Sequence, residues 1–145
     1  MTQAYNRMSR TQIDAFLAAP RHAIVAAQRE DGRPELSPVW YVFEASRLYF
    51  STFSRAARCR HLRRDPRIAI CVDGAHPDAR YVRIEGTAEI VDASTPWRDD
   101  LEWRILRRYH DSDDEARRYE AGLADQGASA LVVVTPDRII GRDYN

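Results

Sequence analysis

Short apolar segments recur along the whole chain and limit the folds open to it. Each is rich in β-branched and aromatic residues and is bounded by Gly, Pro, Asp or Ser, a pattern typical of strands separated by turns. The expected strands are residues 22–28, 35–44, one that starts at 48, and 68–72, 81–91, 130–135 and 138–144. About seven strands with few helices predict a mainly β domain, a small closed or nearly closed barrel with helices at its ends.

Turn and bend residues refine this prediction. Asp31-Gly32 favours a hairpin turn after the first strand. Pro38 cannot donate a ladder hydrogen bond, so its segment should be an edge strand, a bulge or the wall of a site. Gly86 marks a bend or bulge of the kind that closes barrels. Pro136-Asp137 is interpreted as a turn between the last two strands.

Helices are expected at three further places. Ser9 and Gln12 resemble a capping box, and the helix that follows should bury Ile13, Phe16 and Leu17 before it stops at Pro20. Residues before Met8 should be frayed. Residues 96–109 and 113–124 form the other two expected helices. The first of these carries an apolar stripe interpreted as facing the core: Trp97, Leu101, Ile105 and Tyr109.

The segment after Phe50 has the chemistry of an anion site. Hydroxyls of Ser51, Thr52 and Ser54 follow the strand, and Ser54 is expected to cap a basic helix over residues 55–64. A helix N-terminus attracts anions. Arg55 and Arg58 are three residues apart, on one side of the first turn, and guanidinium groups bind phosphate oxygens in pairs. We therefore expect a phosphate at Arg55 and Arg58.

Composition excludes several classes of protein. A chain of 145 residues predicts one domain, residues 1–145, and its net charge of zero provides no overall field for nucleic acid or membrane. Cys59 and Cys71 form no CxxC pair, so we expect buried, reduced thiols in a cytoplasmic protein. The histidines lack metal-ligand spacing, so no metal site is expected. A long apolar segment is missing, so we expect neither a signal peptide nor a membrane span.

Several of these segments together resemble a known family. The matching segments, in chain order, are Asp-Gly-Arg-Pro at 31–34, Ser-Pro-Val-Trp-Tyr at 37–41, the stretch 48–67 with Leu-Arg-Arg-Asp-Pro-Arg at its end, and Tyr-Val-Arg-Ile-Glu-Gly-Thr-Ala at 81–88. They resemble the flavin-binding split-barrel proteins related to pyridoxamine 5'-phosphate oxidase, above all the mycobacterial-type branch that uses the deazaflavin coenzyme F420. The resemblance spans residues 22–91, and residues 135–141 fit the closing strand of the family.

The resemblance implies a homodimeric split β-barrel with two cofactor sites at the subunit interface. It implies that the backbone of four residues lines the tricyclic ring: Ser37, Pro38, Val39 and Trp40. It implies that five others hold the ribityl and phosphate end: Ser51, Thr52, Arg55, Ala57 and Arg58. Tyr81 would approach the cofactor from the other chain. The family often has lysine where this chain has Arg58, so the phosphate geometry can differ.

The first functional hypothesis is an oxidoreductase. Reduced coenzyme F420 would deliver hydride to a small, unsaturated or planar acceptor, and the cofactor would supply the chemistry, so no residue is assigned a catalytic role. Trp40, Tyr41 and Tyr81 are candidates for stacking the acceptor. FMN is the alternative cofactor. A basic groove through Arg60, Arg63 or Arg64 would suit the acidic tail of F420 and favours the deazaflavin.

The second hypothesis is a non-catalytic module that binds a flavin or haem. The histidines that could ligate haem iron are His22, His61, His76 and His110. A basic helix could also dock nucleic acid, but residues 55–67 contain no Phe, Tyr or Trp side chain on which a base could stack. Nucleic acid is therefore not expected as a partner.

Overall fold

The computed structural model describes residues 6–145, and these residues form seven strands in one sheet. The strands are β1 (Ala23–Gln28), β2 (Pro34–Val39), β3 (Tyr41–Glu44), β4 (Arg47–Phe53), β5 (Arg67–Asp73), β6 (Arg80–Val91) and β7 (Ser129–Asp143). The helices are α2 (Arg10–Ala18), α3 (Ala57–Arg64), α4 (Pro96–Arg108), α5 (Asp113–Gly122) and the short 3₁₀ helix η1 (Ala124–Gln126). The predicted mainly β fold is confirmed.

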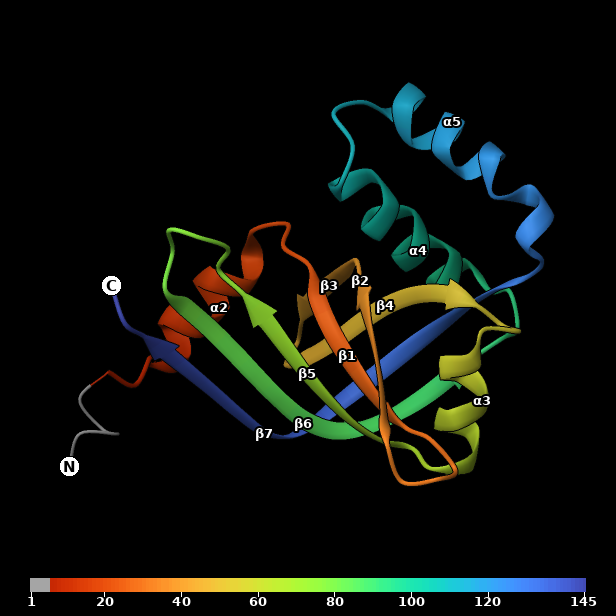
Figure 1. The fold of residues 1–145 in the computed structure, drawn as a ribbon. Helices are drawn as coiled ribbons and strands as arrows, with labels where there is room; N and C mark the ends of the chain where they lie inside the picture. Colours follow the sequence, from red (N-terminus) through yellow and green to blue (C-terminus); the bar gives the residue numbers. More distant parts are fainter. Residues whose placement is uncertain (1–5) are drawn as a thin grey trace.

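The sheet curls until its two edges meet. Its order is β2-β1-β5-β6-β7-β4-β3, with every neighbouring pair antiparallel. The edge strands β2 and β3 are joined through Trp40 alone, so residues 35–44, expected as one strand, turn a corner there. Pro38 lies on the edge strand, as predicted. The result is a split barrel in which the long strands β6 and β7 bend beneath the others, with α2 and α3 at opposite ends (Figure 1).

A bulge bends the two longest strands. The pairing register of β6 and β7 shifts between Glu85 and Gly86, so that Gly86 pairs with Pro136 and Asp137 is the extra residue. A Cβ atom on Gly86 would lie 2.3 Å from the Thr135 carbonyl oxygen, which explains the glycine. The predicted bulge at Gly86 is confirmed. The predicted turn at Pro136-Asp137 is wrong, because a bulge accommodates proline without ending the strand.

Two apolar cores lie on either side of β4 and β7. The larger fills the barrel, and the smaller packs Leu101 and Ile105 of α4 against Tyr49, Leu131 and Val133. Because both faces of these strands are covered, their sequences are continuously apolar rather than alternating. In the predicted α4 stripe, Leu101 and Ile105 are buried and Tyr109 is half-buried, but Trp97 is exposed.

The first described residues, 6–8, lie beside the end of β7, near α2 (Figure 1). The predicted capping box of Ser9 and Gln12 is confirmed, and α2 buries the three expected side chains. Residues 1–5, expected to be frayed, lie outside the described residues. Asn6 and Arg7 are not frayed: the Asn6 carbonyl accepts a 2.9 Å hydrogen bond from the Asp143 amide, and Arg7 forms a bridge with Arg142.

Two other expectations concern thiols and membranes. Cys59 is buried as expected, but Cys71 is exposed because it lies on the outer face of β5, where side chains alternate with the core. Within residues 6–145, none of the helices has the length and apolar character needed to cross a membrane.

Candidate functional site

The basic helix α3 begins later than the sequence indicates. Its N-cap is Ala56, and no side chain caps it. The predicted Ser54 cap is wrong, because the Ser54 hydroxyl instead donates a 2.7 Å hydrogen bond to Asp92 and the chain turns between Phe53 and Ala56. Arg55 therefore precedes the helix and is exposed, whereas Arg58 lies in its first turn. The two arginines are not equivalent, and only Arg58 is directed inward.

Two hydroxyl groups hold the Arg58 guanidinium. Its Nε donates to Ser37 Oγ at 3.1 Å, and its Nη1 donates to Thr52 Oγ1 at 2.6 Å. Among residues 6–145, Arg58 forms no ion pair with a carboxylate, and its Nη2 donates no hydrogen bond. A half-buried cation with spare donors and no protein counter-charge is suited to binding an anionic ligand.

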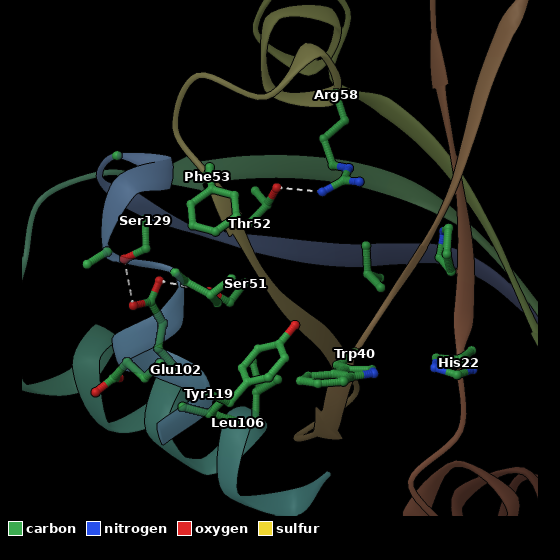
Figure 2. A pocket seen from close by; sticks show the side chains of 17 residues that line it. His22, Trp40, Ser51, Thr52, Phe53, Arg58, Glu102, Leu106, Tyr119 and Ser129 are labelled. Carbon is green, nitrogen blue, oxygen red and sulfur yellow. Dashed lines mark hydrogen bonds between the residues drawn. The ribbon is translucent and has the colours of Figure 1, made fainter. Parts of the chain in front are cut away.

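Arg58 forms part of the wall of a cavity of about 540 Å³ (Figure 2). The volume lies in the range of small-molecule and cofactor sites, roughly 300–1,000 Å³. The predicted site residues that line it are Pro38, Val39, Trp40, Ser51, Thr52 and Arg58. Ser37 touches the site through its hydrogen bond with Arg58. Arg55, Ala57 and Tyr81 do not line the cavity.

A carboxylate network forms the wall contributed by α4. Glu102 accepts hydrogen bonds from Ser51 Oγ at 3.2 Å and from Ser129 Oγ at 2.9 Å. It also forms a 3.1 Å ion pair with Arg98, which is only 5% exposed. Sequence reasoning missed this network because its members lie on three distant elements. The one available signal was the spacing of four between Arg98 and Glu102.

Aromatic rings close the cavity beside Trp40. The indole is stacked on Tyr109, with centroids 4.9 Å apart, and also contacts Tyr119 of α5 at 5.2 Å. The Tyr109 hydroxyl donates to the Arg21 carbonyl at 2.6 Å, and burial raises the pKa of this phenol. Tyr41, expected as a stacking candidate, is instead fully buried in the barrel core, where burial raises its pKa to about 12.

The other basic residues of α3 lie outside this cavity. Arg63 pairs with Asp92 at 3.1 Å, Arg60 donates to the Arg55 carbonyl, and Arg64 donates to the Gln28 carbonyl. All three are exposed, and the charge of Arg63 is neutralised by its carboxylate partner, Asp92. These three arginines therefore do not line the cavity.

The histidines are dispersed. His22 lines the cavity, His61 contacts Glu35 at 3.0 Å, and His110 Nδ1 contacts the Leu106 carbonyl at 2.7 Å. His76 is exposed in the β5–β6 loop. Within the described part of the chain, no group of three or more His, Cys, Asp or Glu side chains could hold a metal ion.

Comparison with known families identifies the architecture. The family model described as pyridoxamine 5'-phosphate oxidase matches residues 9–143. The chain belongs to this family. The flavin-binding split-barrel fold that the resemblance implied is thus confirmed.

Solved structures with the same fold include proteins named for different ligands. A conserved hypothetical protein from Mycobacterium tuberculosis is 27% identical, with a TM-score of 0.72 over 94% of this chain and 85% of the other. An F420 reductase is 21% identical, with a TM-score of 0.66 over 87% of this chain and 94% of the other. A haem storage protein from Vibrio cholerae is 15% identical, with a TM-score of 0.69 over 90% and 92%. The fold therefore does not by itself select the ligand.

The residues present fit a flavin-type cofactor of this family. The cavity combines an apolar wall at Pro38, Val39 and Trp40 with a cationic end at Arg58. The apolar wall suits a planar ring, and the cationic end suits a phosphate.

Proposed function

We propose that the chain is an oxidoreductase that binds coenzyme F420 in this cavity and serves hydride transfer to a small, planar or unsaturated acceptor. The observation that carries the proposal is the Arg58 guanidinium, which is held by Ser37 and Thr52 and lacks a carboxylate partner in the described chain. These three side chains would bind the phosphate. The backbone of residues 37–40 would contact the ring. Reduced deazaflavin, when bound, supplies the hydride, while the protein orients it and excludes water.

FMN is the second candidate cofactor, because Arg58, Thr52 and Ser37 would serve its phosphate equally well. The choice of F420 is supported by the sequence resemblance to the F420-dependent branch and by the likeness to an F420 reductase. Arg60, Arg63 and Arg64 add no support for F420, since they do not line the cavity and each contacts another part of the chain.

We further propose that the protein acts as a homodimer. An apolar patch covers the outer face of β2, β1 and β5: Leu36, Pro38, Ile24, Ala26, Ala69 and Cys71. Directly paired residues share one face of a sheet, and Ile24 pairs with both Pro38 and Cys71. Leu36 is 64% exposed and Ile24 is 37% exposed in the single chain. Pro38 also lines the cavity, so a second copy on this patch would border the cofactor.

Tyr81 is consistent with a role across such an interface. It lies at the start of β6, stacks on Tyr144 with a centroid distance of 6.4 Å, and does not line the cavity of its own chain. In the proposed dimer, Tyr81 of each protomer approaches the cofactor of the other.

A fluorescence titration of the apoprotein with coenzyme F420 and, separately, with FMN tests the cofactor. Saturable binding of F420 at least tenfold tighter than FMN is the expected result. Tighter binding of FMN would show that FMN, and not the deazaflavin, is the cofactor. Binding of neither, together with a Soret shift on adding haemin, would contradict the oxidoreductase proposal and favour a haem-binding module.

A further inference from the structure

The donor and acceptor roles of the Ser51 hydroxyl are fixed by its contact with Glu102. Glu102 is paired with Arg98, and an ionised carboxylate has no proton to donate. In the 3.2 Å contact with Glu102, Ser51 must therefore be the donor. A hydroxyl has one proton and two lone pairs, so Ser51 can offer only its lone pairs to a ligand in the cavity.

The hydroxyls beside Arg58 have the opposite polarity. Thr52 Oγ1 and Ser37 Oγ both accept from the Arg58 guanidinium, which has no lone pair to offer in return. Each keeps its own proton for a ligand. Ser51 and Thr52 are consecutive on β4, so their side chains point to opposite sides of the strand, Ser51 toward Glu102 of α4 and Thr52 toward Arg58 of α3 (Figure 2). Both residues line the cavity, so a ligand that spans this end of β4 meets an acceptor on one side and donors on the other.

This alternation matches a particular ligand chemistry. The donors Arg58, Thr52 and Ser37 suit an anion, and the neighbouring acceptor Ser51 suits a hydroxyl group attached close to that anion. We infer that Glu102 is a positioning residue that holds Ser51 as an acceptor for a hydroxyl of the polyol chain between the ring and the phosphate of the bound cofactor. The inference rests on the proposed function.

The network could instead serve only to fasten α4 to the sheet. Arg98 Nη2 also donates to the Ser129 carbonyl at 3.2 Å, and Ser129 Oγ donates to Glu102, so the network joins α4 to the start of β7. A purely structural role would make Glu102 variants weaken every ligand alike. A positioning role would change only the contribution of the polyol chain.

Riboflavin and lumiflavin separate the two roles, because lumiflavin has a methyl group in place of the polyol chain. The readout is the ratio of their dissociation constants, measured by flavin fluorescence. Ser51→Ala and Glu102→Gln are each expected to reduce the riboflavin preference by about three- to tenfold, the effect of one hydrogen bond. In the Gln variant, the side-chain amide can donate to Ser51 and reverse its polarity.

Glu44→Gln is the matched control. Glu44 is also paired with an arginine of α4, Arg104, at 2.9 Å, but it does not line the cavity. Its riboflavin preference should equal that of the wild type. If Glu102→Gln does not fold, a combined Arg98→Met and Glu102→Met variant replaces the buried ion pair with apolar groups. That variant should show the same loss of preference.

The possible outcomes are distinct. An unchanged ratio in Ser51→Ala overturns the inference and leaves the proposed function standing. Equal weakening of both ligands by loss of Glu102 also overturns it, because that is the structural role. If the wild-type protein binds neither riboflavin, FMN nor F420, the proposed function fails and the inference fails with it.

Discussion

The Trp40 indole lies parallel to the phenol ring of Tyr109, with 7° between their planes and 4.9 Å between their centroids. Trp40 is the corner at which the two edges of the sheet meet, and Tyr109 is the residue that ends α4. The stack therefore joins the closure of the barrel to the helical wall of the cavity. The Tyr109 hydroxyl extends the link to the chain before β1 through the Arg21 carbonyl.

Replacing Tyr109 should separate the ring contact from the hydrogen bond. Tyr109→Phe keeps the stack and should lower the free energy of unfolding by about 1 kcal/mol. Tyr109→Leu loses the aromatic pair as well and should cost about 1 kcal/mol more. Urea unfolding followed by circular dichroism measures both. Equal stabilities of the two variants would show that the stack contributes nothing.

Arg58 should discriminate phosphorylated from unphosphorylated flavin. Arg58→Gln removes a charged donor and is expected to weaken FMN by about 10- to 100-fold, because hydrogen bonds to charged groups are worth about 1.5–3 kcal/mol. Riboflavin, which lacks the phosphate, should change by less than about threefold. Isothermal titration gives both constants.

Arg60→Gln is the control for that comparison, because Arg60 is exposed on the same helix, does not line the cavity and donates to the Arg55 carbonyl. It should bind both flavins as the wild type does. A parallel loss of FMN and riboflavin affinity in Arg58→Gln would contradict a phosphate-binding role.

Gly86 should tolerate no side chain. In Gly86→Ala the new Cβ would lie 2.3 Å from a backbone oxygen at the bulge, and we expect a loss of at least about 2 kcal/mol in the free energy of unfolding. Gly122→Ala, at the end of α5, places its Cβ in open space. In thermal unfolding, Gly86→Ala should lower the midpoint temperature, whereas Gly122→Ala should raise it or leave it unchanged. Similar decreases in both variants would refute the steric explanation.

Tyr41 should make the protein sensitive to alkali. Burial raises its pKa to about 12 in the folded chain, from an ordinary value of 10.0. The neutral phenol is thus favoured by folding, so stability is complete below pH 10 and is lost as the pH rises from 10 to 12, by up to about 2–3 kcal/mol. The measurement is urea unfolding at several pH values.

Tyr41→Phe cannot ionise and should show a shallower decline over that pH range. At pH 7 the variant should be slightly less stable than the wild type, because it lacks the Tyr41 hydroxyl, whose one proton is shared between the Leu17 and Ala19 carbonyls. An identical alkaline slope in the variant would assign the effect to other groups, of which Tyr109 is the first to test.

The apolar patch on β2, β1 and β5 should control assembly. Leu36→Glu places a charge at its most exposed apolar side chain and should shift sedimentation from dimer to monomer. Trp97→Glu is the control, because Trp97 is 51% exposed on α4 and lies outside the patch. A wild-type monomer at micromolar concentration would contradict the proposed dimer.

Local patterns predicted the fold well where one residue type has one structural meaning. Pro38 indicated an edge strand, a bulge or the wall of a site, and Gly86 a bend or bulge; the structure places Pro38 on an edge strand and a bulge at Gly86. Pro136 was misread, since proline is compatible with either a turn or a bulge, and the choice depends on Gly86, fifty positions earlier. Ser54 was misread as a cap because its hydroxyl has a competing acceptor, Asp92, in a distant loop.

The site was predicted on one side only. The cationic side could be predicted because Ser51, Thr52 and Arg58 are close in sequence. The acidic side was not, because Glu102 reaches Ser51 across 51 positions and Ser129 across 27. On a helix, a half-buried glutamate such as Glu102 has the same sequence pattern as a solvated one until its neighbours on other elements are known.

Strands β6 and β7 pair with each other from Arg80 with Asp143 to Val91 with Leu131, yet residues 92–128 leave the sheet between them. That excursion contains α4 and α5, which supply one wall of the cavity and none of the ladder hydrogen bonds (Figure 1). The sequence of the wall can consequently vary without a change in the strand pairing of the barrel. Changes in the length or sequence of the excursion can alter what the cavity admits while the pairing of the sheet stays the same, so one scaffold can acquire new ligands by changing a single connection.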